Sequence, residues 1–271
     1  MDGTRHSGGG LLPLLALCAA LRIVNALLVV TFFNPDEYWQ SLEPAHRLVF
    51  GYGHLTWEWA AGLRGYSHPL VFAALYKGLQ VLSLDTAFTT SRGPKVLQGL
   101  FAAVGDVYVY RISKDLYGVR TARFALACQL ASWFNFYCLV RTYSNSAESV
   151  LLLAGVYHWG LHRHGDMASG PPGSRDSRWG QRMGLLAAGW CVVVRPPSVL
   201  LWLTVGCWSL WCCSPAGRLG LIADAAVIGS AVLGISTFID RLFYGRWVLV
   251  MWEFAKFNVL EGGSSLYGSH P

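Results

Sequence analysis

The chain has 271 residues, of which 54% are hydrophobic and only 13% are charged. A soluble domain carries about 25% charged residues, so this composition excludes an ordinary soluble protein. Apolar runs recur along most of the chain, and a run of about 20 residues is long enough to span a bilayer as a helix. The sequence therefore predicts an all-α fold, a polytopic bundle of transmembrane helices.

The net charge of +6 and the seven cysteines do not point to a ligand. The basic residues lie in short segments between apolar runs and form no Lys/Arg block with interleaved aromatics, so nucleic-acid binding is not expected. Their positions fit the headgroups of membrane lipids. The cysteines form no CxxC pattern, and His46, His54 and His68 lack zinc-ligand spacing, so no metal site is expected.

Eight apolar segments are the predicted spans, and the third, 95–112, contains the ionisable Asp106. The segment 68–84 is short and contains Lys77, so it either crosses the membrane or lies along its interface. Between 183–194 and 196–213, the Pro196-Pro197 pair removes two backbone donors and breaks the helix at Arg195. In chain order the predicted spans are about 11–33, 68–84, 95–112, 122–140, 147–161, 183–194, 196–213 and 219–239.

The connecting segments set the expected orientation. Positive charge is denser around 111–123, 162–182 and 213–219, which places these segments and the N-terminus in the cytosol. The Gly- and Pro-rich segment 162–182 is expected to be a flexible loop. The loop 34–67, the Arg141–Ser146 turn, Arg195 and the segment 240–271 then share the luminal side. The chain has no closing helix or polar tail, so we expect the front part of a longer protein.

An acidic pair directly follows the first span. In Asn34-Pro35-Asp36-Glu37, Asn34 is a helix N-cap and Glu37 completes a capping box. The alternative is functional: Asp36 is a general base that takes a proton from an attacking hydroxyl. At helical spacing Asp36, Gln40, Glu43 and Arg47 share one face, which predicts an amphipathic helix in the membrane interface. Both interpretations can hold together.

Several other polar and aromatic residues have two possible uses. Trp57 belongs to a group of loop aromatics that form a membrane-interface belt or stack on sugars. Arg195 either binds a phosphate or extends to the interface. For Asp106, we expect a structural ion pair with the nearby Arg111 or Lys114.

The motifs of the first loop resemble glycosyltransferase family 22, a family of the multi-span GT-C type. Looser resemblance continues through Arg141-Thr142-x-Ser144, Arg195-Pro196-Pro197, Asp240-Arg241-x-x-Tyr244-Gly245 and the end at Pro271. Members of this family are about twice as long as this chain, which therefore corresponds to a partial GT-C domain. The first-loop strings are Asn34-Pro35-Asp36-Glu37-Tyr38-Trp39-Gln40, Tyr52-Gly53-x-Leu55-Thr56-Trp57-Glu58-Trp59 and Arg64-x-Tyr66-Ser67-His68-Pro69.

The resemblance implies an inverting mannosyltransferase in the endoplasmic reticulum membrane, without a cofactor. Its donor would be dolichyl phosphate mannose, and its acceptor a GPI glycolipid precursor that receives a third mannose in α1,2 linkage. Asp36 maps onto the position of the catalytic base, with Glu37 as an orienting or secondary acid. A related mannosyltransferase of N-glycan assembly, and a non-catalytic membrane protein or transporter, remain alternatives.

Charge and sidedness, rather than a transferred motif, give the candidates that would contact substrate. The cationic ones would neutralise the departing phosphate, and the other two would contact the sugars or the base. The cationic candidates are Arg64, His68, Arg195 and Arg241, and the other two are Gln40 and Trp57.

Overall fold

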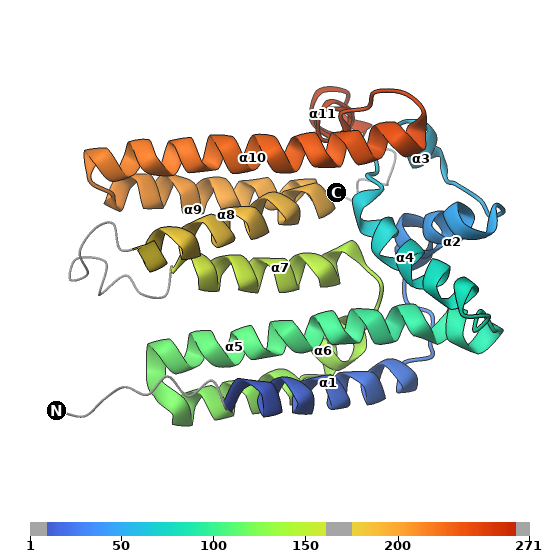
Figure 1. Ribbon diagram of the computed structural model, residues 1–271, viewed down its shortest axis with the longest axis horizontal. Coiled ribbons are helices and arrows are strands. Elements are labelled where there is room, and N and C mark those ends of the chain that lie inside the picture. The colour runs from blue at the N-terminus through green and yellow to red at the C-terminus, as the bar shows by residue number, and fades with distance from the viewer. Residues whose placement is uncertain (1–9, 161–174, 264–271) are drawn as a thin grey trace.

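The computed structural model describes residues 10–160 and 175–263, and every regular element in these ranges is a helix (Figure 1), as predicted. The long helices lie side by side, and most of the short helices gather at one end of them, while α6 lies alongside α5. The long helices are α1 (Leu11–Leu28), α5 (Ala87–Ala131), α7 (Ser144–Trp159), α8 (Arg175–Val194), α9 (Val199–Cys212) and α10 (Pro215–Tyr244). Helix α4 (Ser67–Val81) is of similar length to α9, and the shorter elements are η2 (Tyr38–Leu42), α2 (Glu43–Phe50), α3 (Trp57–Ala60), α6 (Trp133–Cys138), η4 (Pro196–Ser198), α11 (Val250–Ala255) and η5 (Lys256–Leu260).

Helices α1 and α10 have membrane character. They are the two helices of the described ranges that are long and apolar enough to cross a bilayer, with mean hydropathies of 2.2 and 1.9. Only 22% and 17% of these stretches are buried within the chain, so large apolar side chains such as Leu17, Val24 and Val227 face outward. Exposed side chains of this kind are stable in contact with lipid tails, which identifies a membrane protein.

Helix α5 contains two antiparallel limbs. The backbone leaves the helical conformation at Gly118, whose φ of 84° favours glycine because it has no Cβ. The chain reverses there, so Leu126 of the second limb packs with Ala103 of the first limb and Cys18 of α1. The two limbs cover most of the segments 95–112 and 122–140, and α6 extends the second limb.

The helices approach closely where glycines face a neighbour. A Cβ at Gly99 would lie 3.0 Å from the carbonyl oxygen of Arg22, where α1 crosses α5. A Cβ at Gly184 would lie 2.7 Å from the backbone nitrogen of Trp159, where α7 meets α8. Small residues allow the backbones of membrane helices to come this close.

A buried polar network joins α1 to both limbs of α5. The guanidinium of Arg22 donates to both carboxylate oxygens of Asp106 at 2.8 Å, and Gln129 donates to Oδ1 of Asp106 at 3.2 Å. The expected partners of Asp106 were therefore wrong. Arg111 instead lies over the ring of Tyr157, 4.2 Å from its centroid. Arg22 is the partner because α1 packs against the face of α5 that carries Asp106.

Helix α4 lies across the end of the long helices and does not run alongside them (Figure 1). Its 15 residues extend about 22 Å, less than the roughly 30 Å of the hydrocarbon core. Phe72, Ala73 and Tyr76 of α4 bury Leu42 and Ala45 of the segment that follows the acidic pair. The amphipathic segment 38–50 is thus packed on α4 along one side, with Arg47 exposed on the other.

The structure corrects one expected loop. Of the segment 162–182, residues 162–174 lie outside the described ranges, and α8 is already helical from Arg175. The expected break after α8 is present: Arg195 has an extended backbone with φ −146° and ψ 100°, and α9 begins after η4. A residue before proline disfavours the helical region, which accounts for the break.

Candidate active site at the loop-rich end

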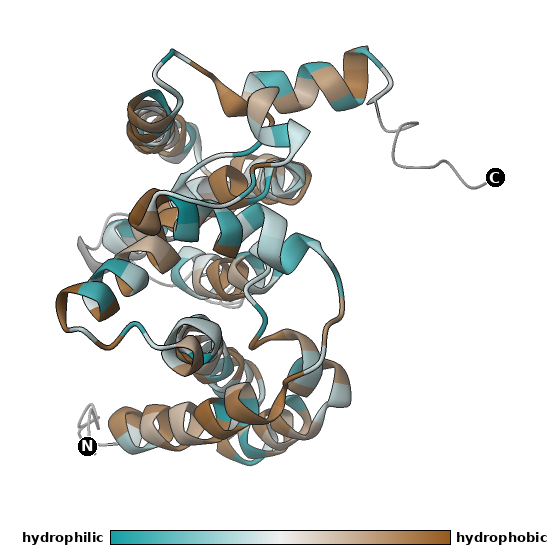
Figure 2. Cartoon of the chain, turned by 90° about the vertical axis from the view of Figure 1, so that its right-hand side faces the viewer, coloured by the Kyte–Doolittle hydropathy of each residue, from teal (hydrophilic) through white to brown (hydrophobic). Residues whose placement is uncertain are grey.

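The loop-rich end brings together motifs that are far apart in the sequence. It contains the loops of residues 29–66, the turns near 139–146 and 195–198, and the segment after α10 (Figure 1). Figure 2 looks at this end and shows hydrophilic short elements between the ends of apolar helices. Ion pairs and hydrogen bonds connect Glu37 to Arg141, Glu148 to Arg195 and Tyr66 to Asp240. The four polar motifs therefore share one end, as the sequence indicated.

The two acids of the pair have different environments. Asp36 is exposed, and its backbone N–H donates to Oδ1 of Asn34 at 2.9 Å, which confirms Asn34 as a cap. Glu37 is completely buried, and its Oε2 accepts from Nη1 of Arg141 at 2.8 Å. The other oxygen, Oε1, lies 3.9 Å from Nζ of Lys95. Glu37 pairs with Arg141 and does not close a capping box with Asn34, so that half of the prediction was wrong.

Charged and polar side chains surround Asp36. Partial burial raises the pKa of Asp36 above the ordinary value, and the nearby carboxylate of Glu58 raises it further. The guanidinium of Arg64 and a hydrogen bond from Gln40 oppose this by lowering the pKa of Asp36. Arg64 itself forms an ion pair with Glu58 at 2.7 Å. Predicted residues Gln40 and Arg64 thus act on the pKa of Asp36, together with Glu58, which the sequence had not singled out.

The end of α10 holds the loop that carries Arg64. Oδ1 of Asp240 accepts from the backbone N–H of Tyr66 at 2.8 Å, and the hydroxyl of Tyr244 donates to the carbonyl of Arg64 at 2.7 Å. The ring of Tyr66 packs on Tyr244 with centroids 5.0 Å apart. Asp240 and Tyr244 are spaced i, i+4 and so lie on one face of the helix. This spacing in the Asp240-x-x-x-Tyr244 motif was the available signal for their role.

Two of the predicted cations lie elsewhere at this end. Nη1 of Arg195 pairs with Oε2 of Glu148 at 2.7 Å, and the hydroxyl of Ser198 bonds the other oxygen of Glu148. The Arg195 side chain is still 41% exposed, so it is accessible to a ligand. Arg241 lies 5.8 Å from the centroid of the Trp247 ring. Nothing recorded in the structure connects Arg195 or Arg241 directly to Asp36.

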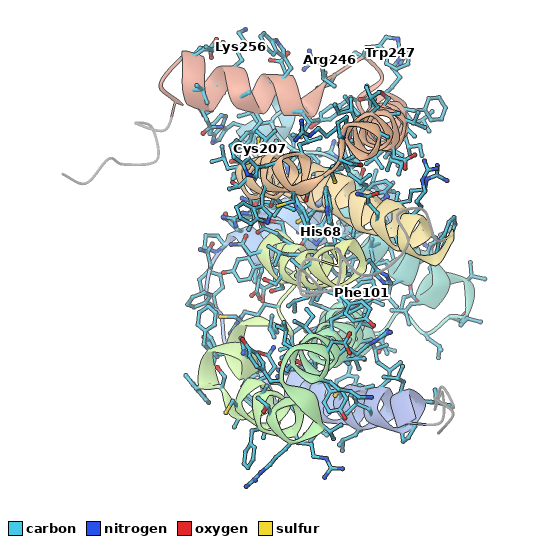
Figure 3. The ribbon with its side chains drawn as sticks, turned by 90° about the vertical axis from the view of Figure 1, so that its left-hand side faces the viewer. His68, Phe101, Cys207, Arg246, Trp247 and Lys256 are labelled. Atoms are coloured by element: carbon cyan, nitrogen blue, oxygen red, sulfur yellow. The ribbon has the colours of Figure 1, made fainter. Side chains whose placement is uncertain are left out.

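His68 does not supply the positive charge that was expected of it. The side chain is buried within the body of the molecule (Figure 3), and burial lowers the pKa of His68 to about 4. The imidazole is therefore neutral at physiological pH, because burial disfavours its charged form. Trp57 is half-exposed and packs against Phe257 of η5, with ring centroids 5.5 Å apart.

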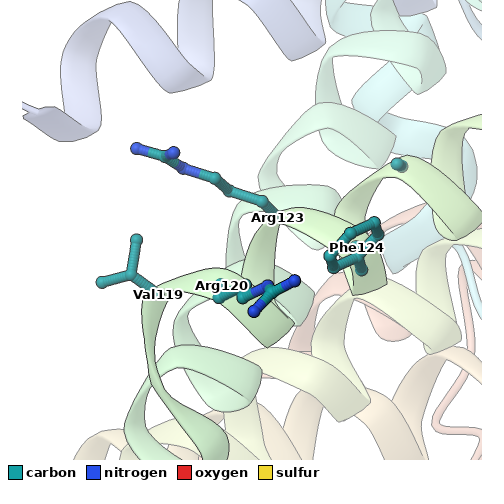
Figure 4. Close-up of a pocket in the computed structure, with 5 residues that line it drawn as sticks. Val119, Arg120, Arg123 and Phe124 are labelled. Carbon is teal, nitrogen blue, oxygen red and sulfur yellow. The ribbon is translucent and has the colours of Figure 1, made fainter.

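A hollow of about 590 Å³ lies at the opposite end of the molecule, on the second limb of α5 (Figure 4). Its walls belong to the segment that follows Gly118, so it is separate from the acidic loop. Among the described residues, no group of three His, Cys, Asp or Glu side chains is arranged to hold a metal ion. The hollow is lined by Val119, Arg120, Arg123, Phe124 and Ala127.

The fold and the site define a class of protein: a helical membrane protein that holds one exposed aspartate in a fixed loop at an end of its helices. A family model, the Alg9-like mannosyltransferase family, matches residues 13–271. The chain belongs to this family.

Curated relatives with similar sequences are also named as mannosyltransferases. The chain is 47% identical over 254 residues to the mannosyltransferase APTG1 of Arabidopsis thaliana, covering 94% of this chain and 45% of the relative. It is 41% identical over 253 residues to the GPI alpha-1,2-mannosyltransferase 3 of Bos taurus, covering 93% and 44%. For the protein of the same name from Homo sapiens the identity is 40% over 259 residues, covering 95% and 44%. The chain thus spans less than half the length of these relatives. No solved structure matches it.

Proposed function

We propose that this chain carries the catalytic loop of a GPI mannosyltransferase. The donor is dolichyl phosphate mannose, and the acceptor is a GPI precursor that receives its third mannose in α1,2 linkage. The reaction takes place on the luminal side of the endoplasmic reticulum membrane. The names of the Bos taurus and Homo sapiens relatives support the acceptor and the linkage, and the apolar helices support the membrane location.

The single observation that carries this proposal is the exposure of Asp36 beside a cation in an otherwise fixed loop. Asp36 takes the proton of the acceptor hydroxyl while the hydroxyl oxygen attacks C1 of mannose. The bond between C1 and the phosphate oxygen breaks, and dolichyl phosphate leaves with the bonding electron pair. Attack from the opposite face converts the β-linked donor into an α-linked product. No cofactor takes part in this displacement.

The neighbouring side chains have distinct roles in this mechanism. Arg64, which lowers the pKa of Asp36, keeps the base ionised and is the best-placed cation for the departing phosphate. Arg195 and Arg241 are further candidates for this phosphate, while neutral His68 can offer only a hydrogen bond. Gln40 orients the carboxylate of Asp36. The half-exposed ring of Trp57 is available to stack on a sugar of the acceptor.

The decisive test replaces the base. Asp36→Asn, introduced into the protein at its full natural length, is expressed in cells that lack transfer of the third GPI mannose. Removal of a general base costs about 10²–10⁴-fold in rate, so we expect this variant to leave GPI anchors unrestored. Its amount in the cells should equal that of the wild-type protein. Asp85→Asn is the matched control, because Asp85 is an exposed aspartate in the connection between α4 and α5.

Two results would overturn the proposal. One is normal mannose transfer by Asp36→Asn, which removes the base from the mechanism. The other is a cytoplasmic position of residue 36 in topology mapping. If the wild-type protein mannosylates lipid-linked oligosaccharides and leaves GPI precursors unchanged, the acceptor belongs to N-glycan assembly.

A further inference from the structure

Glu37, the neighbour of Asp36, is held by contacts to its side-chain carboxylate and to its backbone carbonyl. Its carboxylate pairs with Arg141 at 2.8 Å. Its backbone carbonyl accepts from the hydroxyl of Thr142 at 2.9 Å, and the hydroxyl of Ser41 lies 2.6 Å from the same oxygen. Glu37, Ser41 and Thr142 are all buried. The residue next to the exposed aspartate therefore cannot move without breaking buried polar contacts.

Arg141 extends this constraint to the segment that leads into the acidic pair. Nη1 donates to the carbonyl of Thr31 at 2.8 Å, Nη2 donates to the hydroxyl of Thr31 at 3.0 Å, and Nε donates to the carbonyl of Tyr137 at 3.1 Å. The guanidinium also lies 4.2 Å from the centroid of the Tyr137 ring. One buried guanidinium thus connects the end of α6 with residues on the N-terminal side of Asp36 and with Glu37.

A second cation supports the same carboxylate. Lys95 of α5 lies 3.9 Å from Oε1 of Glu37, and its Nζ donates to the carbonyl of Val29 at 3.1 Å. Two buried cations therefore face one buried carboxylate. Opposite charges this close to a buried carboxylate offset part of the cost of burying it.

Burial also removes Glu37 from the reaction itself. With no exposed surface, its carboxylate cannot touch a sugar or a phosphate; of the two roles that the family resemblance implied, an orienting acid fits this burial and a secondary acid does not. Adjacent residues in this turn point in different directions, so fixing Glu37 inward holds Asp36 outward. The exposed Asp36 and the buried Glu37 thus face opposite sides of one turn.

We propose that Arg141 is a positioning residue, which acts through Glu37 to fix the direction of the Asp36 carboxylate. This inference rests on the proposed function, because it assigns Arg141 to the same reaction. It predicts a defect in turnover and not in substrate affinity, since Arg141 is completely buried and touches no substrate.

The test is the conservative variant Arg141→Lys. A lysine keeps the positive charge but lacks the planar fork that makes the bonds to Thr31, Glu37 and Tyr137 together. Loss of alignment by about 1 Å costs on the order of 100-fold in rate. We expect kcat per folded molecule to fall by about 10–100-fold, with KM for donor and acceptor unchanged. The assay uses purified protein and measures mannose transfer to a GPI precursor.

Arg22→Lys is the matched control. Arg22 and Asp106 form a second buried arginine–carboxylate pair among the described residues, and this pair lies within the helix bundle. The control reports what the same substitution does through stability alone, so kcat per folded molecule should stay close to wild type. An equal fall in kcat for both variants would show a general structural effect and overturn the proposal.

Thr142→Val provides a second route if Arg141→Lys does not accumulate. It removes only the hydrogen bond to the carbonyl of Glu37, with little change in side-chain shape, and we expect a smaller fall in kcat with KM unchanged. The positioning role would be rejected if kcat were normal in Thr142→Val and in any Arg141→Lys protein obtained. If Asp36→Asn were inactive in the same assay, the proposed function would still stand. Activity of Asp36→Asn would instead reject the proposed function.

Discussion

The helix bundle and the loop-rich end each contain a completely buried arginine–carboxylate pair, and the two pairs have different effects. In the bundle, Arg22 binds both oxygens of Asp106 and so joins two helices that already satisfy their own backbone groups. At the loop-rich end, Arg141 binds one oxygen of Glu37 and also donates to the carbonyl and hydroxyl of Thr31 in the loop before the acidic pair and to the carbonyl of Tyr137 in α6. The same kind of ion pair stabilises helix packing in one region and fixes the path of a loop in the other.

The difference follows from where backbone hydrogen bonds are made. A helix satisfies its backbone groups internally, whereas a buried loop must find other partners. Three such partners are the Thr142 hydroxyl for the Glu37 carbonyl, the Asp240 carboxylate for the Tyr66 N–H, and the Tyr244 hydroxyl for the Arg64 carbonyl. The conformation of the loop-rich end therefore depends on side chains from distant parts of the chain.

The largest expected loss of stability comes from the pair in the bundle. Asp106→Ala leaves the guanidinium of Arg22 buried without its counter-charge, a change that costs about 3–5 kcal/mol. We expect a large fall in the thermal unfolding temperature of the detergent-solubilised protein. Asp85→Ala, at an exposed aspartate, is the control. An unfolding temperature equal to that of the control would show that the pair does not stabilise the bundle.

A smaller effect is expected at the end of α10. Tyr244→Phe removes the hydrogen bond to the carbonyl of Arg64, worth about 0.5–1.5 kcal/mol, and loosens the loop near Asp36. The unfolding temperature should fall slightly, while backbone amides of residues 60–66 should exchange with deuterium faster than in the wild type. Tyr52→Phe, at an exposed tyrosine of the same end, should change neither. If amide exchange of residues 60–66 were unchanged in Tyr244→Phe, the hydrogen bond from α10 would not stabilise this loop.

The smallest effect concerns ionisation and not folding. A base must be deprotonated, so activity is lost as pH falls through the raised pKa of Asp36. Because Arg64 lowers this pKa, Arg64→Gln should move the acidic limb of the pH–kcat profile to higher pH. Arg47→Gln, which removes an exposed arginine that donates to the carbonyl of Gly53, should leave the limb in place. A limb that stays fixed or moves to lower pH in Arg64→Gln would contradict this placement of Arg64.

Much of the fold could be predicted from the sequence because it depends on local patterns. Apolar runs predicted the all-α fold and most helices, and the Pro196-Pro197 pair predicted the break after α8. The sidedness of the polar motifs followed from their spacing along these runs. The start of α8 at Arg175 was missed, since polar residues that favour a loop are tolerated in a helix end.

For the site, the sequence predicted Asp36, Gln40 and Arg64 as candidates, because the acidic motif and its resemblance to a family are properties of the chain itself. It did not determine the partners of Glu37 and Asp106 or the neutral state of His68. Only the tertiary structure decided these, because an ion pair or a buried imidazole depends on which side chains the packed helices bring within a few ångströms. The sequence alone determined a membrane-embedded helical protein with an acidic loop, and the packing of distant segments decided which acid faces the solvent.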